Sequence, residues 1–232
     1  MNLFINDIPV RILKPGKKPE PGDINLVIDA KTEAITKAKL MNHVWVKNST
    51  VNELDVILDL INSRVPMNLR SLFVSVDNYE SVKIYLKKKF KVIKAAGGLV
   101  RKKDKFLMIY RMKKWDLPKG KKENDETYPQ AAVREVNEEC NVVVKLVGKK
   151  ICTTWHTYTM NKNSMLKKTR WFVMDLIDDS KIRPQKEEDI EEIRWMTQKE
   201  VYHALENSYR SIHFVLEEYY SKSEKRVAKN NH

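Results

Sequence analysis

The stretch from Gly120 to Val142 reads GKKENDETYPQAAVREVNEECNV, and it decides the fold of the larger part of the chain. Thr127 and Gln130 make a capping box, in which each residue's side chain satisfies a backbone N–H at the start of a helix. Pro129 lies in the first turn, where its missing N–H does no harm. The sequence therefore predicts a helix that begins after Thr127.

Carboxylates are concentrated on one side of this expected helix. Glu135, Glu138 and Glu139 are three or four positions apart and share a face, whereas the opposite side is apolar, with Ala132, Val136 and Cys140. Two carboxylates about 5.5 Å apart repel by roughly 1 kcal/mol in water and by about 3 kcal/mol at an effective dielectric of 20. We therefore expect a bound cation, and a set of oxygen ligands suits Mg²⁺ or Mn²⁺ better than zinc.

Fixed spacings connect this face to residues upstream. Five residues separate Gly120 from Glu126, and seven more precede the pair Arg134-Glu135. A solvated acidic stripe, the ordinary alternative, needs neither the glycine nor the arginine at those distances. The pattern resembles the Nudix box, G-x5-E-x7-R-E-U-x-E-E-x-G-U with U apolar, at every position except Asn141, where the family has Gly. Because Asn tolerates the left-handed conformation that this Gly supplies, we expect Asn141 to have a positive φ.

The resemblance continues upstream of the box. Residues 95–98, Ala-Ala-Gly-Gly, resemble the first Nudix strand, and residues 115–120 resemble the loop that precedes the box. This implies a Nudix α/β/α sandwich with a mixed sheet. It also implies an enzyme that hydrolyses a nucleoside diphosphate linked to another group, with the cation neutralising phosphate oxygens and activating water.

The resemblance assigns roles by position. It implies metal ligands at Glu135, Glu138, Glu139 and the Lys119 carbonyl, with Glu126 behind them or bound through water. Arg134 is implied to orient the glutamates.

The general base varies between Nudix subfamilies. Our candidates are Glu187 and Glu188, which lie in the acidic loop before Trp195, with Glu135 as the alternative. A solvated run of charge explains that loop equally well.

Cations close to the box favour a long phosphate chain as substrate: Arg111, Lys119, Lys121 and Lys122. The run Pro-Lys-Gly-Lys at 118–121 resembles diadenosine tetraphosphate hydrolases and inositol-pyrophosphate phosphatases. Tyr158, Lys167 or Lys168, and Trp171 resemble the residues that hold phosphate and adenine in the former. We therefore expect hydrolysis of a nucleoside or dinucleoside polyphosphate. The alternatives are an inositol pyrophosphate phosphatase, an RNA-acting decapping-type hydrolase or a catalytically silent regulator.

Aromatic residues at Trp155, His156 and Tyr158 could stack on a base, but aromatic residues in a strand more often belong to the core. We favour the core interpretation for this group.

Three parts are expected along the chain: a small α/β domain at 1–91, the Nudix domain at 92–220 and a disordered tail at 221–232. The first part shows a hairpin signal at Asn6-Asp7, a helix after the Thr50–Glu53 capping box and another capped by Asp77. Dimerisation, substrate gating and partner binding all remain open for residues 1–91.

The balance of 44 Lys and Arg against 31 Asp and Glu gives a net charge of +13, which favours an anionic ligand. No nucleic-acid-binding motif stands out, so we expect a small polyphosphate and no nucleic acid; a homodimer is left open. The first thirty residues show no secretory signal and no segment has 18 consecutive apolar residues, so we expect a soluble cytoplasmic protein. Cys140 and Cys152 are expected to be small buried hydrophobic residues.

Overall fold

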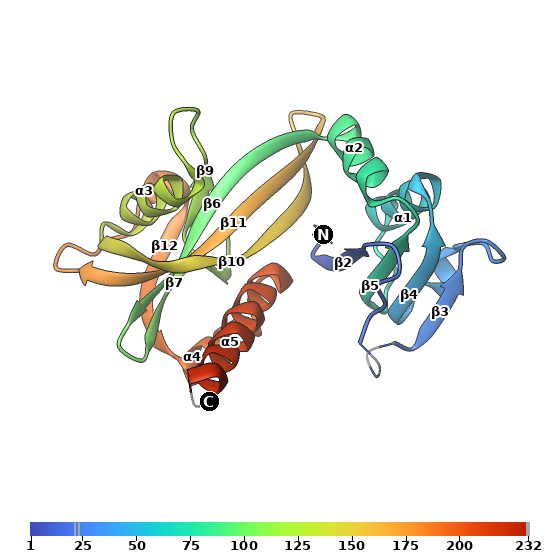
Figure 1. Ribbon diagram of the computed structural model, residues 1–232. Coiled ribbons are helices and arrows are strands. Elements are labelled where there is room, and N and C mark those ends of the chain that lie inside the picture. Colours follow the sequence, from blue (N-terminus) through green and yellow to red (C-terminus); the bar gives the residue numbers. More distant parts are fainter. Residues whose placement is uncertain (21, 23, 231–232) are drawn as a thin grey trace. The chain divides into compact units, whose positions relative to one another are not determined.

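The computed structural model describes residues 1–20, 22 and 24–230, with side chains up to position 223 (Figure 1). The chain divides into two compact units. Unit 1 comprises residues 1–93 and 155–167, and unit 2 comprises residues 94–154 and the chain from Lys168 onward. The first division falls two residues beyond the boundary expected from the sequence. A single boundary does not describe the chain, because residues 155–167 return to unit 1.

Unit 1 contains a sheet with the strand order β1 (Asn2–Ile5), β2 (Ile8–Leu13), β5 (Leu69–Val76), β4 (Asn42–Ser49) and β3 (Leu26–Asp29). β1 and β2 form an antiparallel hairpin whose turn residues, Asn6 and Asp7, both have positive φ, as a tight two-residue turn requires. The pairs β2–β5, β5–β4 and β4–β3 are parallel. Parallel neighbours need a crossover, which α1 (Val51–Ser63) supplies between β4 and β5.

The helices of unit 1 begin at side-chain caps. The Thr50–Glu53 capping box starts α1, whose buried face consists of Leu54, Ile57, Leu58 and Ile61. α2 (Tyr79–Lys89) is capped by Asn78, which accepts the Ser81 N–H, so the cap expected at Asp77 is wrong by one position. A short 3-10 helix, η1 (Lys37–Lys39), precedes β4.

Residues 155–167 complete the core of unit 1. Leu166 is fully buried in that core and Trp155 packs against it. The His156 ring stacks on Phe4 with their centroids 5.2 Å apart. The core interpretation of Trp155 and His156 is therefore confirmed, whereas that of Tyr158 is wrong, because Tyr158 is 37% exposed.

The sheet of unit 2 has the strand order β12 (Ile190–Thr197), β7 (Lys105–Arg111), β6 (Lys91–Lys102), β11 (Asn163–Asp178) and β10 (Val143–Met160). The short strands β8 (Lys114–Asp116) and β9 (Lys119–Lys121) pair with β7 and β6. Pairing of β7 with β12, β8 and β6 is antiparallel. The short strand β9 thus places the loop before the expected helix beside the middle of the sheet.

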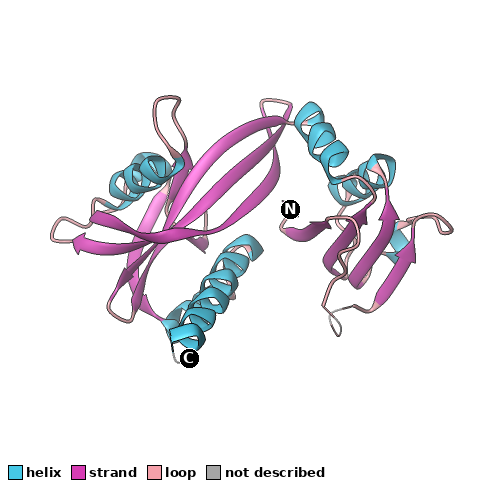
Figure 2. Ribbon diagram, in the orientation of Figure 1, coloured by secondary structure: helices cyan, strands magenta, loops and turns pink. Residues whose placement is uncertain are grey.

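Helices cover both faces of this sheet (Figure 2). α3 (Tyr128–Cys140) packs on one face, where Leu107 belongs to the same buried cluster as Val136. The preceding residue of the strand, Phe106, points the opposite way, and its ring centroid lies 5.6 and 6.1 Å from those of Tyr219 and Tyr220. The expected α/β/α sandwich with a mixed sheet is confirmed.

The C-terminal region contains two helices, α4 (Gln198–Leu205), which begins at a Thr197–Glu200 capping box, and α5 (Arg210–Asn230). The tail expected at 221–232 is wrong for residues 221–230, which continue α5; residues 231 and 232 lie outside the described chain. The helix continues because Lys222 pairs with Glu218 one turn earlier and also donates to the Ile151 carbonyl.

Both cysteines are free and buried, as expected, and burial raises the pKa of the Cys152 thiol to about 12. Of the helices that the structure describes, none is long and apolar enough to cross a membrane.

Candidate active site

The helix predicted from the sequence is α3. The Thr127–Gln130 capping box is formed, with Pro129 in the first turn. The helix ends at Asn141, whose φ of 51° and ψ of 47° are left-handed, which confirms the expected conformation. The Asn141 side-chain N–H also donates to the Lys181 carbonyl, a contact that glycine could not make.

The three glutamates of α3 differ in exposure. The side chain of Glu139 is 1% exposed and that of Glu135 13%, whereas that of Glu138 is 50% exposed. Glu139 lies among the buried residues of the helix, beside Val136 and Cys140. The carboxylate face is therefore deeply set at Glu139 and open to solvent at Glu138.

Glu139 is held by the loop before the helix. The Lys119 backbone N–H donates to its Oε2 at 2.8 Å, and the Arg111 guanidinium lies 3.4 Å from Oε1. Burial raises the pKa of Glu139 to about 7, although Lys119 and Arg111 act to lower it. These two contacts thus offset only part of the cost of burying a negative charge.

Glu135 requires the glycine at position 120. A Cβ on Gly120 would lie 1.8 Å from Oε2 of Glu135, far inside van der Waals contact. Burial raises the pKa of Glu135 too, although Arg134 lowers it. Similarly, a Cβ on Gly98 would lie 2.7 Å from Cγ2 of Val136, so β6 can approach α3 only where the strand lacks a side chain. Gly98 and Gly120 are thus both required by close approach.

Arg134 joins the carboxylates into one network. Its guanidinium lies 2.7 Å from both Glu126 and Glu138 and 2.9 Å from Glu135, and it donates to the Lys121 carbonyl at 3.0 Å. Arg134 therefore fixes the side chains on α3 relative to the loop that leads into it.

The donor chemistry fits a hard divalent cation. The carboxylates and the Lys119 carbonyl supply only oxygen, and burial raises the pKa of both Glu135 and Glu139. Over the described residues, no three acidic, His or Cys side chains are already grouped at metal-ligand spacing. Arg134 instead pairs with Glu135 and Glu138, while Arg111 faces Glu139. Cation binding would require Glu138, the most exposed of the three, to leave Arg134.

The acidic loop is brought to the C-terminal end of α3. Backbone N–H groups of Arg183 and Gln185 donate to the Cys140 and Glu139 carbonyls at 3.1 and 3.0 Å, which fixes the loop to the helix. The loop then forms a 3-10 helix, η2 (Lys186–Glu188). This docking supplies partners for helix carbonyls that would otherwise lack them.

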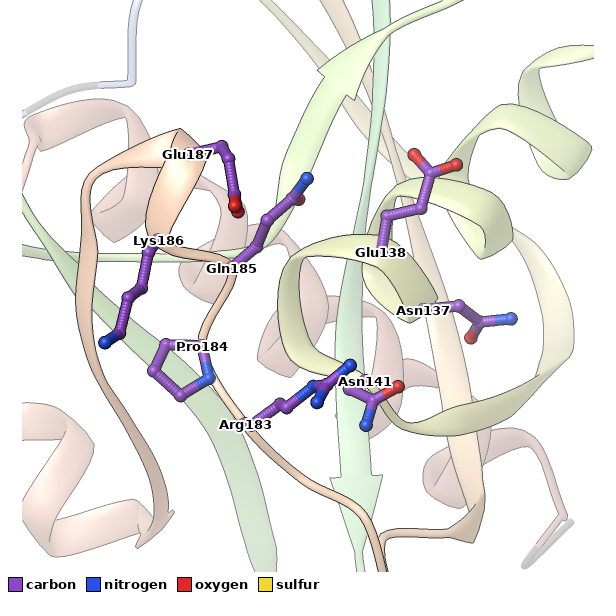
Figure 3. A pocket seen from close by; sticks show the side chains of 8 residues that line it. All are labelled: Asn137, Glu138, Asn141, Arg183, Pro184, Gln185, Lys186 and Glu187. Carbon is purple, nitrogen blue, oxygen red and sulfur yellow. The ribbon is translucent and has the colours of Figure 1, made fainter.

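Both base candidates thereby lie near the glutamates. Glu188 is 3.6 Å from Arg111, which also faces Glu139. Glu187 lines a cavity of about 690 Å³ together with Glu138 (Figure 3).

The expected phosphate-binding cations are less available than the sequence suggests. The Lys119 ammonium is paired with the buried Asp116, and Arg111 is paired with Glu139 and Glu188. The Lys122 ammonium donates to backbone carbonyls of the same loop, while Lys121 is exposed. Of the four, two are thus committed to carboxylates in this structure.

The expected adenine-binding residues are divided between the two units. Trp171 is fully buried and donates to Thr154 at 2.9 Å, so the expectation that its ring stacks on a base is wrong. Tyr158 and Lys167 belong to unit 1, whereas α3 and Lys168 belong to unit 2. The sequence pattern of a strand could not predict the burial of Trp171, because it does not reveal which side of the strand the rest of the protein covers.

Sequence reasoning also missed residues around the cavity. Arg183 and Gln185 line it from the loop, and Asn137 lines it from α3. No local signal identifies them, since they are brought together only when the loop docks on the helix.

A family model described as NUDIX domain matches residues 92–216. This chain belongs to the Nudix family. Among solved structures, the chain is similar to a NUDIX hydrolase from Nitrosomonas europaea, with 26% identity over 53% of this chain and 67% of that chain, at a TM-score of 0.42. A second NUDIX hydrolase from that organism shows 18% identity over 57% and 90% of the two chains, at a TM-score of 0.48. An Ap4A hydrolase from C. elegans shows 20% identity over 57% and 98%, at 0.45.

No curated protein matches the chain. The family assignment depends on the matched domain, and it makes the chain a hydrolase that acts on pyrophosphate bonds. Nudix hydrolases generally use divalent metals and act on small nucleotide-derived substrates.

Proposed function

We propose that this Nudix hydrolase is a Mg²⁺-dependent pyrophosphohydrolase that cleaves a phosphoanhydride bond in a nucleoside or dinucleoside polyphosphate. The observation that carries this proposal is the juxtaposition of Glu135, Glu138 and Glu139 on α3 with the backbone of Gly120 and Lys119. Mn²⁺ would suit the same oxygen donors.

Metal ligands in this proposal are Glu135, Glu138, Glu139 and the Lys119 carbonyl. When bound, the metal would supply charge neutralisation at the phosphate and a water of lowered pKa. Arg134 positions the ligands through its contacts with Glu135 and Glu138, and Glu126 holds Arg134 from the other side. Burial of Glu139 keeps its carboxylate in a medium of low dielectric, where attraction for a cation is stronger than in water.

Glu187 is the better candidate to accept the proton of the attacking water. It lines the same cavity as Glu138, and it has no ion pair among the described residues. Glu188, in contrast, is already engaged in an ion pair with Arg111 at 3.6 Å. Glu135 remains the alternative, and comparing Glu187→Gln with Glu188→Gln separates the loop candidates.

The proposed substrate has a chain of phosphates, for which exposed Lys121 and the nearby Lys122 offer charge. Because Trp171 is buried, adenine recognition at that residue no longer favours a dinucleotide over an inositol pyrophosphate. A panel of diadenosine polyphosphates, nucleoside triphosphates, ADP-ribose, capped RNA and inositol pyrophosphates decides the class. We expect the highest kcat/KM on nucleotides with four or more linked phosphates. ADP-ribose or a nucleoside triphosphate as best substrate would contradict the preference for long chains.

The metal site is tested by Glu138→Gln and Glu139→Gln. Each should lower turnover by roughly a hundredfold or more, because transition-state charge stabilisation is lost, while the fold persists. Glu191→Gln, at an exposed position of β12, is the matched control and should retain activity. Full activity in EDTA or in the Glu139→Gln protein would rule out the assigned metal site.

A further inference from the structure

The cations around the α3 carboxylates are mostly engaged. Arg134 is bound to Glu126, Glu135 and Glu138, and Arg111 faces Glu139. Arg183 differs from them. Its side chain is exposed, and within the described part of the chain it makes no ion pair and no side-chain hydrogen bond.

Arg183 lies in the wall of the 690 Å³ cavity next to the carboxylates. The cavity is lined from α3 by Asn137, Glu138 and Asn141, and from the loop by Arg183, Pro184, Gln185, Lys186 and Glu187. In Figure 3 the Arg183 side chain extends from the loop toward Asn141, whereas the Lys186 side chain points away from α3. The guanidinium is therefore the cation that this cavity presents beside the helix.

A purely structural role at the end of α3 explains Arg183 poorly. A cation near a helix C-terminus can stabilise its last carbonyls. Here the Glu139 and Cys140 carbonyls already accept from backbone N–H groups, at 3.0 and 3.1 Å. The Asn141 side chain adds a hydrogen bond to the Lys181 carbonyl. The loop is thus fixed to the helix without the guanidinium.

The hydrogen-bond donors of the cavity point to an anion at Arg183. With its side-chain amide turned so that its nitrogen faces acceptors, Asn137 donates to the Val142 carbonyl at 2.7 Å, and Asn141 donates to the Lys181 carbonyl. Since both amide groups are engaged with backbone carbonyls, the Arg183 guanidinium is the charged donor that a ligand beside α3 would meet. A phosphate is rich in acceptors, and the planar guanidinium matches two of its oxygens at once.

We propose that Arg183 binds a substrate phosphate beyond the one held at Glu135, Glu138 and Glu139, and so sets the preference for phosphate-chain length. This inference rests on the proposed function. Glu138 and Glu187 would repel a phosphate, but a cation held at Glu138 removes that repulsion. A cavity of about 690 Å³ has room for more than one phosphate.

The first test measures binding without turnover. Methylenediphosphonate, whose P–C–P bridge is not hydrolysed, is titrated calorimetrically into the full chain in Mg²⁺. Arg183→Gln should raise its Kd roughly ten- to a hundredfold, because one charge-assisted contact is lost. Arg183→Lys should recover part of the affinity, since lysine keeps the positive charge but lacks the planar guanidinium that binds two phosphate oxygens at once. Lys181→Gln removes a charge two positions away, outside the cavity lining, and should bind like the wild type.

The second test compares kcat/KM across adenosine and diadenosine phosphates of increasing chain length. Arg183→Gln should lower it most for the longest chains, with no change in melting temperature. Unchanged analogue affinity, an analogue that fails to bind the wild type, or an equal loss on all substrates with a lower melting temperature would each overturn the inference. If the wild type hydrolyses none of the panel while analogue binding still depends on Arg183, the proposed function fails and the phosphate site stands.

Discussion

Gly120→Ala is expected to disable the site through Glu135. The added Cβ would lie 1.8 Å from Oε2 and 2.2 Å from Cδ of that carboxylate. Because carbon needs roughly 3.5 Å from a neighbouring heavy atom, the carboxylate must move by more than about 1 Å. β9 is held against β6 by the pairing of Gly120 with Ala96, so the Glu135 side chain is expected to yield before the strand does.

The displacement should reduce activity strongly. It breaks the 2.9 Å contact between Glu135 and Arg134 and misplaces a proposed metal ligand. Misplacement of about 1 Å costs on the order of a hundredfold in rate, which corresponds to about 2.7 kcal/mol. The measurement is kcat/KM in Mg²⁺ on the best substrate of the panel, with melting temperature recorded in parallel.

A double-mutant cycle shows whether the loss passes through Glu135. In a Glu135→Ala background the alanine at position 120 meets no carboxylate, so adding Gly120→Ala should change kcat/KM by less than about twofold. Full activity of Gly120→Ala alone would refute the reasoning. A further large loss of kcat/KM on adding Gly120→Ala to the Glu135→Ala protein would also refute it, since the added Cβ would then be acting on the backbone rather than on Glu135.

Three further outcomes are expected. Asn141→Val should lower the free energy of unfolding by about 1–2 kcal/mol in thermal melts, because the left-handed conformation is costly for a branched side chain. Asn141→Gly should be near neutral, because glycine adopts this conformation without strain but loses the hydrogen bond to the Lys181 carbonyl. Equal melting temperatures for the two variants would refute this. A chain starting at Lys94 should be poorly soluble, because Leu166 and Trp155 lose the unit 1 core in which they pack. Replacing both residues by Ser should improve the solubility of this truncated chain. A truncated chain that is soluble and active without these replacements would contradict the prediction. Trp171→Ala should cost about 3–5 kcal/mol of stability and weaken adenine and inositol substrates alike; a loss confined to adenine compounds would restore a base-binding role.

Features governed by local chemistry were predictable from the sequence. The capping boxes at Thr50 and Thr127 start α1 and α3 where expected. Asn141 ends α3 with a positive φ, and Asn6-Asp7 turns the first hairpin. Each depends on backbone groups within a few residues, so the necessary information lies within a short segment.

The remaining features depend on contacts between distant segments. The sequence alone determined the Nudix helix and the carboxylates on it, because their spacing is a property of one helix. Only the tertiary structure decided that Trp171 is buried, that residues 155–167 complete unit 1 and that Arg111 is committed to Glu139. Arg183 reaches the cavity only because its loop docks on α3 about forty residues away along the chain. Burial and ion pairing are set by whichever segment packs against a residue, and local sequence carries no record of that partner.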